Sequence, residues 1–249
     1  MRTVVLGVLL LISFPSLIPS KFVEESCNTS DDACPSLLAY LLPHDSKLAE
    51  IASKFQVNLT GLVGANAFDA AKSFSGNEIL PQNTLLRIPI SCPCANGVRH
   101  SSTAYTVKPI DTVDSIAAEF SGLVSAEQIQ TANGMWGSGG LQIGRSLVIP
   151  LPCACFENSD NGVAAIYMSY VVRQGDSLKS IGQVYGTTVS DLVAVNGLGT
   201  AFVYPADILA IPLPGLMFYS SNLLVEFWLF LLGLGRPTYC EWENFKYFV

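Results

Sequence analysis

The sequence predicts an α+β protein made of three copies of one small unit. Two repeated patterns support this prediction. The first is an opening run of aromatic, polar and apolar residues that recurs without a gap every 65 residues, beginning at Tyr40, Tyr105 and Tyr170. The second is an apolar stretch that ends in Asn and leads to an Ile-Pro pair. In the three copies these features fall at Asn66 and 88–89, Asn133 and 149–150, and Asn196 and 211–212. Arrays of such units usually bind other molecules.

The second copy shows the expected elements most clearly. Residues 105–107 alternate in character as a short strand does, and Asp111 precedes apolar residues at helical spacing, so we expect it to cap a helix. The capping box Ser125-x-x-Gln128 predicts a second helix, which Asn133-Gly134 ends. A strand is expected over 146–149. We expect Pro150 to end that strand, because proline cannot continue a hydrogen-bonded ladder.

The predicted order in each copy is therefore strand, helix, helix, strand. Two strands this short need to pair antiparallel, with the helices packed on one face. The third copy repeats the plan, whereas the first is less regular because Ser46 stands where the others have Asp. The sequence divides into a leader, three units and a tail. The expected boundaries are 1–20, 36–91, 104–152, 169–214 and 215–249.

The first 20 residues have the pattern of a secretory signal peptide. Arg2 is their only charge before the small residues and prolines that end at Ser20, and the apolar run over 4–14 is too short to span a bilayer. An uncleaved membrane anchor is the alternative. Sequons at Asn28 and Asn58 favour the same secretory route, since Asn-x-Ser/Thr is an N-glycosylation acceptor.

The cysteines are grouped at the junctions between copies. Six of the seven precede residue 156: Cys27, Cys34, Cys92, Cys94, Cys153 and Cys155. Two Cys-x-Cys pairs follow the Ile-Pro pairs of the first and second copies. Their four thiolates could hold zinc, but a secretory route, an even count and the absence of Cys-x-x-Cys spacing favour disulfides. We expect no metal and no cofactor, and the residues alone do not fix the pairing.

The charge limits the class of ligand. The formal net charge is −7 and the chain has no basic cluster, so a nucleic-acid partner is not expected. A neutral or weakly charged ligand fits this composition better.

The segments 122–130 and 146–155, together with three units joined by Cys-x-Cys pairs, resemble the plant LysM-domain GPI-anchored receptor-like proteins. The resemblance covers about residues 24–214 and is greatest to members associated with peptidoglycan as well as chitin. It implies three LysM modules of βααβ order, stapled by disulfides into a compact ectodomain. It also implies the disulfides Cys27–Cys94, Cys34–Cys155 and Cys92–Cys153.

The resemblance further implies a shallow glycan groove between the loop after the first strand and the loop after the second helix. In the second copy these loops contain Lys108, Pro109, Ile110, Asp111, Thr112, Ala132, Asn133, Gly134, Met135 and Trp136. Alternatives stay open for several of them. Asp111 and Asp176 are either helix caps or ligand contacts. The three repeated asparagines fit helix terminators better than sugar ligands, and Trp136 is either a sugar platform or a cover for a junction between copies.

By this resemblance the chain binds N-acetylglucosamine-containing glycans (chitin or peptidoglycan oligomers) in plant innate immunity and signals through a LysM receptor kinase. A secreted, sequestering lectin is the alternative. An enzyme is not expected: the three copies leave no room for a catalytic domain, and no nucleophile is predicted near His44 or His100. The expected location is the outer face of the plasma membrane, by a GPI anchor as in the family, or the apoplast.

The segment 215–249 departs from the resemblance, because Gly215 stands where a cysteine is expected. It has an apolar stretch over 216–234, interrupted by Glu226 and followed by a polar and aromatic end. Three interpretations remain: an altered or truncated C-terminus, a transmembrane anchor, and a loosely folded apolar tail. Membrane association is therefore left open by the sequence.

Overall fold

The computed structural model describes residues 25–28, 33–66, 76–135, 141–156 and 165–214. The chain separates into two units, Met1–Leu216 and Met217–Val249, and every described residue belongs to the first. The expected signal peptide, the tail and Trp136 lie outside the described residues. Within the described ranges, no helix combines the length and apolar character needed to cross a lipid bilayer.

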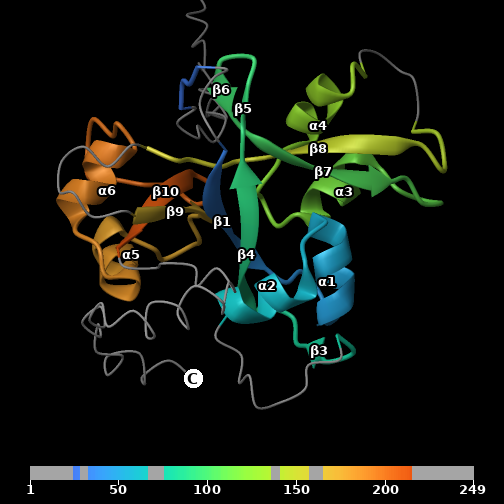
Figure 1. Cartoon of the computed structure of the whole chain (residues 1–249), viewed down its shortest axis with the longest axis horizontal. Coiled ribbons are helices and arrows are strands. Elements are labelled where there is room, and N and C mark those ends of the chain that lie inside the picture. Colours follow the sequence, from blue (N-terminus) through green and yellow to red (C-terminus); the bar gives the residue numbers. More distant parts are fainter. Residues whose placement is uncertain (1–24, 29–32, 67–75, 136–140, 157–164, 215–249) are drawn as a thin grey trace, which may run out of the picture. The chain divides into compact units, whose positions relative to one another are not determined.

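Each copy contains the predicted order of strand, helix, helix and strand (Figure 1). The first copy consists of β1 (Cys34–Leu41), β2 (Ser46–Lys47), α1 (Leu48–Phe55), α2 (Leu59–Ala65), β3 (Ile79–Leu80) and β4 (Leu85–Cys92). The short hairpin of β5 (Cys94–Ala95) and β6 (Val98–Arg99) leads to the second copy. The second copy consists of β7 (Ser101–Thr106), α3 (Val113–Glu119), α4 (Ala126–Ala132) and β8 (Ser146–Leu151). The third consists of β9 (Ala165–Val171), α5 (Leu178–Tyr185), α6 (Val189–Val195) and β10 (Ile208–Pro214).

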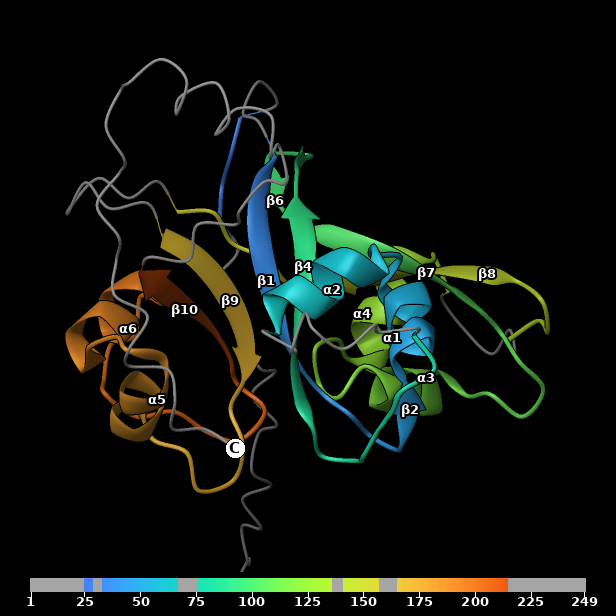
Figure 2. The ribbon, with the colours of Figure 1, turned by 60° about the horizontal axis from the view of Figure 1, so that its bottom comes forward.

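The first and third copies share one sheet, a feature that the repeat pattern did not predict. The four strands have the order β10-β9-β1-β4, and β1 and β9 run parallel, with Leu38 opposite Ser169. The other neighbours in this sheet are antiparallel, as are β7 and β8, which form a separate ribbon in the second copy. Figure 2 shows α5 and α6 beside β9 and β10, whereas α1, α3 and α4 gather at the other end of the sheet.

The prediction that Pro150 ends its strand is wrong, and the equivalent prolines of the other two copies also continue theirs. Pro89, Pro150 and Pro212 lie inside β4, β8 and β10, opposite Leu37, Ser102 and Tyr167. The reason is the position of these strands: β4 and β10 are the two edges of the shared sheet, and β8 has a single partner. An edge strand has a ladder on one side only, so a missing N–H on the outer side removes no hydrogen bond.

Strand β1 is buried on both faces and connects two hydrophobic cores. Leu38 and Tyr40 face the core that the first and second copies share, whereas Leu37 and Ala39 face the core of the third copy. This division follows from the alternation of side chains along a strand. All four residues are no more than 5% exposed. The first copy is therefore held between the other two by apolar burial as well as by covalent bonds.

The three repeated asparagines bind the end of the second helix to the last strand. The Asn196 amide donates to the carbonyls of Leu192 and Ala210 at 2.9 Å, and its oxygen accepts the N–H of Ala210 at 2.8 Å. Asn66 and Asn133 make the same three contacts in their own copies. Each amide thus acts as an extra main-chain rung between a helix and a strand, which favours the interpretation of these residues as helix terminators.

Candidate functional site

The loop after β7 is closed by Asp111. Its Oδ2 accepts the hydroxyl of Tyr105 at 2.9 Å and the N–H of Lys108 at 2.7 Å. Burial and the adjacent carboxylate raise the pKa of Tyr105 to about 12. The prediction that Asp111 caps the following helix is wrong: the N-cap of α3 is Thr112, whose Oγ1 accepts the N–H of Ser115 at 3.0 Å. Asp111 therefore fixes the turn, while its neighbour caps the helix.

The third copy has the same loop closure. Oδ2 of Asp176 accepts from the hydroxyl of Tyr170 at 2.6 Å and from the N–H of Arg173 at 2.8 Å. Here the N-cap of the helix α5 is Ser177, so the expected capping role of Asp176 is also wrong. The aspartates close the loops in both copies because one carboxylate oxygen accepts both a side-chain hydroxyl from the strand and a main-chain N–H from the turn.

Ile110 stands at the tip of the loop in the second copy, in an unusual conformation. Its side chain is fully exposed, at 101%, and its φ of 70° lies in the left-handed region. A β-branched residue there is sterically strained, and such strain is characteristic of ligand-binding and active sites. The equivalent position in the third copy is Gly175, which adopts a φ of 90° without a side chain to strain it.

The rest of this loop is open to solvent. Lys108, Pro109 and Thr112 are exposed, and Asp111 is half-buried. The Lys108 ammonium lies 5.7 Å from the centre of the Tyr105 ring, where it shields the ring from water on one side. The loop thus presents an apolar tip on a base of exposed main chain.

The loop after α4 is the second part of the predicted site. Ala132 and Gly134 are exposed, whereas Met135 is half-buried against the core that the first two copies share. The Asn133 amide makes its three hydrogen bonds to Ile129 and Val148, so its side chain has a structural role. In the described part of this loop, the surface open to a ligand is therefore main chain and small side chains.

Arg145 links the two loops. Its carbonyl accepts the N–H of Val107 at 2.9 Å, next to the first loop, and its guanidinium donates to the carbonyl of Asn133 at 3.2 Å in the second. Val107 also accepts from Gly144 at 2.8 Å. The turn before β8 thereby anchors both loops at the same end of the second copy. Sequence reasoning missed Arg145, since only its contacts, and no motif, indicate this role.

A Ser46–His44–Glu119 chain of contacts lies at the junction of the first two copies, where no nucleophile was expected near a histidine. Ser46 Oγ lies 3.1 Å from His44 Nδ1, and His44 Nε2 lies 3.2 Å from both carboxylate oxygens of Glu119. The contacts are structural, for two reasons. Ser46 is 6% exposed and its hydroxyl donates to the carbonyl of His44, so a substrate has no access to it. Glu119 is also paired with Lys54, at 2.9 Å.

The carbonyl of Asp45 and the carboxylate of Glu119 raise the pKa of His44. Burial favours the neutral acid form of Glu119, but the hydrogen bond and charge of Lys54, with a smaller contribution from His44, lower its pKa overall. Lys54 of the first copy and Glu119 of the second therefore carry opposite charges, which attract each other across the junction.

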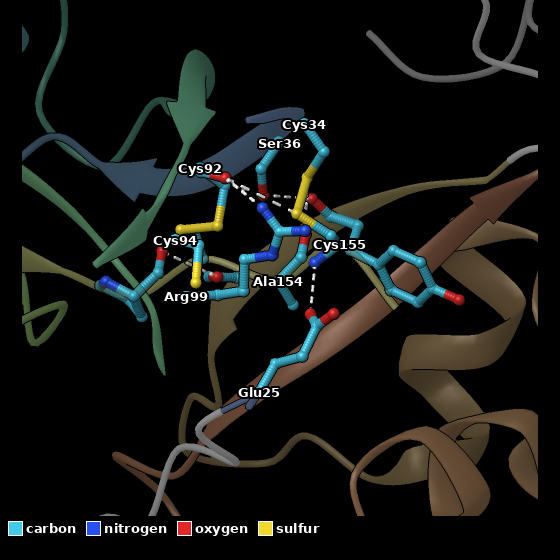
Figure 3. Close-up of a disulfide and its surroundings, with 12 residues drawn as sticks. Glu25, Cys34, Ser36, Cys92, Cys94, Arg99, Ala154 and Cys155 are labelled. Atoms are coloured by element: carbon cyan, nitrogen blue, oxygen red, sulfur yellow. Dashed lines mark hydrogen bonds between the residues drawn. A yellow bond between two sulfur atoms is a disulfide. The ribbon is translucent and has the colours of Figure 1, made fainter. Parts of the chain in front are cut away.

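Three disulfides lie at the junctions between copies in the described part of the chain, and Figure 3 shows the one between Cys34 and Cys155 with its surroundings. They link Cys27 to Cys94, Cys34 to Cys155 and Cys92 to Cys153, which is the pairing that the family resemblance implies. Glu25 reinforces this region because its carboxylate accepts the N–H groups of Cys155 and Phe156, at 2.6 and 2.9 Å. The sulfurs of Cys34, Cys92 and Cys155 lie within 4.8 Å of one another, but all three are bonded as disulfides and are not free metal ligands.

The two sequons have exposed asparagines. Asn58 is the N-cap of α2, and its Oδ1 accepts the N–H of Thr60 at 2.8 Å. Asn28 is exposed near the first disulfide. An amide oxygen that caps a helix leaves the amide nitrogen facing away, so capping and glycosylation at Asn58 are compatible. Glycosylation at both positions stays a prediction.

Comparison with known proteins places these units in a family. The LysM domain family matches residues 105–150 and 170–212, in the second and third copies. The rice (Oryza sativa subsp. japonica) LysM domain-containing GPI-anchored protein LYP6 is 44% identical over 84% of this chain and 54% of its own length. LysM domain-containing GPI-anchored protein 1 of Arabidopsis thaliana is 47% identical over 78% of this chain and 47% of its own length. A further rice relative, named chitin elicitor-binding protein, is 28% identical over 74% of this chain and 52% of its own length.

A solved structure shows the same fold. The ectodomain of a receptor-like kinase superposes with a TM-score of 0.63 at 21% identity, over 75% of this chain and 94% of the ectodomain. The repeats and their fold define a protein with LysM domains. The chain belongs to the family of plant LysM domain-containing proteins that includes the rice and Arabidopsis relatives. It spans about half the length of these relatives.

Proposed function

We propose that this chain binds N-acetylglucosamine-containing glycans (chitin or peptidoglycan oligomers) at the loops 108–112 and 132–136 of the second copy. The observation that carries the proposal is Ile110, which is held fully exposed in a left-handed conformation. Both its exposure and its strain are unfavourable for folding alone, so a ligand that covers the side chain supplies the reason for it.

The chemistry of the two loops suits an acetylated sugar. An acetamide group needs one main-chain donor, one main-chain acceptor and an apolar contact for its methyl group. Turns supply the first two, because their N–H and C=O groups are not all used in a ladder, and Ile110 supplies the third. No ionised side chain is needed, which agrees with a net charge of −7. Trp136, outside the described residues, is proposed as an additional sugar contact.

We also propose that the first copy is a third LysM module, and that the modules occupy 36–91, 104–152 and 169–214. The support is the repeated construction: the first copy has the same order of elements, and Asn66 makes the same helix-to-strand contacts as Asn133 and Asn196. Its irregular opening, with Ser46 in place of Asp, separates it from the pattern of the other two.

At the level of the cell, we propose a receptor-like protein on the outer face of the plasma membrane that signals in innate immunity with a LysM receptor kinase. Support comes from the names of the relatives, which are GPI-anchored proteins and a chitin elicitor-binding protein. The predicted secretory leader at 1–20 and the disulfides agree with an extracellular location. The second candidate is a secreted lectin that sequesters fragments. We propose no catalytic role, and cell fractionation separates the two candidates: the receptor fractionates with membranes and the lectin with the apoplast.

Titration calorimetry of the secreted, disulfide-intact chain tests the binding proposal. The ligands are a chitin oligomer, a muropeptide oligomer and a β-1,4-glucan of equal length that lacks acetamido groups. We expect binding of one or both acetylated ligands and none of the glucan. Absence of binding to both acetylated ligands by a folded sample would overturn the proposal.

The matched variants are Ile110→Ser and Ile79→Ser. Both remove an exposed isoleucine, but Ile79 lies in β3 of the first copy and is 64% exposed. Ile110→Ser is expected to weaken binding by about 10- to 100-fold, since burying an aliphatic side chain is worth about 1.5–3 kcal/mol. Ile79→Ser is expected to leave binding unchanged. Equal effects of the two variants would contradict the proposal that the second copy binds the glycan.

A further inference from the structure

The first and second copies meet through equivalent positions of their first helices. In the repeat alignment, Lys54 and Phe55 of α1 correspond to Glu119 at the end of α3 and Phe120 just after it. Across the junction, Lys54 Nζ lies 2.9 Å from Glu119 Oε2. The rings of Phe55 and Phe120 pack edge to face with centroids 5.8 Å apart. Each residue thus contacts its own counterpart.

Two further hydrogen bonds reach the main-chain carbonyls of the central pair, although their donors stand at different positions of the repeat. The hydroxyl of Tyr40, in the first copy, donates to the carbonyl of Glu119 at 2.8 Å, and Thr103 Oγ1, in the second, donates to the carbonyl of Lys54 at 2.8 Å. Contacts between equivalent patches are the mark of a two-fold, isologous interface. Because the two copies differ in sequence, the central position can hold a Lys on one side and a Glu on the other, and their charges attract.

The third copy exposes the same face. Val184 and Tyr185 of α5 stand at the positions of the Lys–Glu and Phe–Phe pairs. Val184 is 53% exposed, and it lines a shallow hollow with Tyr170, Arg173, Asp176, Ser180, Ile181 and Tyr185. Figure 2 shows α5 at the end of the sheet opposite to α1 and α3, and all the residues that line the hollow belong to the third copy.

We propose that this face of the third copy, centred on Val184 and Tyr185, binds the same face of a second copy of this chain about a two-fold axis. The internal pair of the first and second copies is the precedent for the geometry. At a true two-fold axis each central side chain meets itself, so a Lys or a Glu would be repelled by its own image, whereas valine packs on valine.

The charged residues at the rim of this face also favour a second copy of this chain as its partner. Arg173 and Asp176 lie beside the hollow with Nε and Oδ2 3.9 Å apart, so each subunit presents both signs of charge to its image. Both sequons lie outside 165–214, at Asn28 and Asn58, and an attached glycan therefore does not grow from this face. The inference does not depend on the proposed glycan site, because it uses another copy and another surface.

Sedimentation velocity of the secreted full-length chain without glycan tests the proposal. We expect the wild type to form a dimer as its concentration rises to the order of 100 µM, typical of a weak interface. Val184→Lys and Val184→Glu are each expected to weaken the dimer at least about tenfold, because like charges then meet at the axis. An equimolar mixture of the two variants is expected to restore a dimer, since it recreates the Lys–Glu pairing of Lys54 with Glu119.

Phe202→Glu is the matched control. Phe202 is 75% exposed in the same copy but does not line the hollow, so this variant is expected to dimerise like the wild type. Recovery in the mixture also shows that the charged variants are folded. A monomeric wild type over the whole concentration range would overturn the proposal, as would a dimer that both Val184 variants retain or a mixture that stays monomeric.

Discussion

The hydroxyl of Tyr105 lies 2.9 Å from Oδ2 of Asp111, and this pair fixes the loop that carries Ile110. Tyr170 and Asp176 repeat the pair at 2.6 Å in the third copy. Ser46 replaces the aspartate in the first copy, and there the tyrosine hydroxyl, that of Tyr40, donates instead to the carbonyl of Glu119 in the second copy. One substitution thus converts a contact within a unit into a contact between units.

Asp111→Ala is expected to reduce both stability and glycan binding. It leaves the hydroxyl of Tyr105 and the N–H of Lys108 without their acceptor, which costs about 1–3 kcal/mol of unfolding free energy. The loop that presents Ile110 loses its closure at the same time. Denaturant unfolding and calorimetric titration measure the two effects. The control is Asp176→Ala, which is expected to destabilise similarly and to keep the affinity; an equal loss of affinity in both variants would contradict the assignment to the second copy.

Ile110→Gly is expected to move stability and affinity in opposite directions. Glycine adopts the observed φ of 70° without strain, which saves about 1–2 kcal/mol, and part of this gain is offset by the greater freedom of glycine in the unfolded chain. The same change removes the exposed apolar contact. A raised melting temperature together with weaker binding is therefore predicted. A lower melting temperature would show that the left-handed conformation is not strained.

Asn196→Ala is expected to destabilise more than Asn133→Ala. Both variants remove an amide that bonds three main-chain groups, but Asn196 is 3% exposed, whereas Asn133 is half-buried. Water can replace the lost partners only at the more exposed position. The expected losses are about 2–4 kcal/mol for Asn196, with more than one buried group left unpaired, and about 1 kcal/mol for Asn133. Urea unfolding curves compare the two variants. Equal losses of unfolding free energy would contradict the expectation that the more buried amide is the more costly one to remove.

The junction of the first two copies is expected to weaken as the pH rises. Because the pKa of His44 is raised above 6.5 in the folded state, its contribution to stability is fully present below 6.5 and is lost as the pH rises through the raised value. Glu119 does not oppose this trend, because its lowered pKa keeps it ionised over the same range. The advantage of the wild type over His44→Gln in melting temperature should be larger at about pH 5.5 than at about pH 8. A difference that does not change with pH would contradict the account.

Local pattern was sufficient for much of this fold. The capping box of Ser125 and Gln128, the end of α4 at Asn133 and the order of elements follow from spacing alone, because they depend on contacts within a few residues. The parallel pairing of β1 with β9 could not be predicted, since nothing local in either strand specifies a partner more than 120 residues away. For the same reason, the strand prolines were misread: whether Pro89 is tolerated depends on β4 being an edge.

The site was predicted less completely than the fold. Family resemblance implied the two loops, whose role stays a proposal. Residue type alone assigned Asp111 to a helix cap, but the neighbouring Thr112 takes that place. The strain at Ile110 has no signature in a sequence, because isoleucine is rarely found with a positive φ. Arg145 was missed because a lone arginine before a strand carries no motif, and only its contact to Asn133 shows that it joins the loops.

The most direct measurement for the central claim is a backbone-amide NMR map of the isotopically labelled, secreted chain during titration with the chitin or muropeptide oligomer that binds in calorimetry. We predict that shift changes concentrate in 108–112 and 132–136 of the second copy, with Ile110 among the largest. Changes centred on the loops of the first or third copy, with those of the second unmoved, would contradict the account.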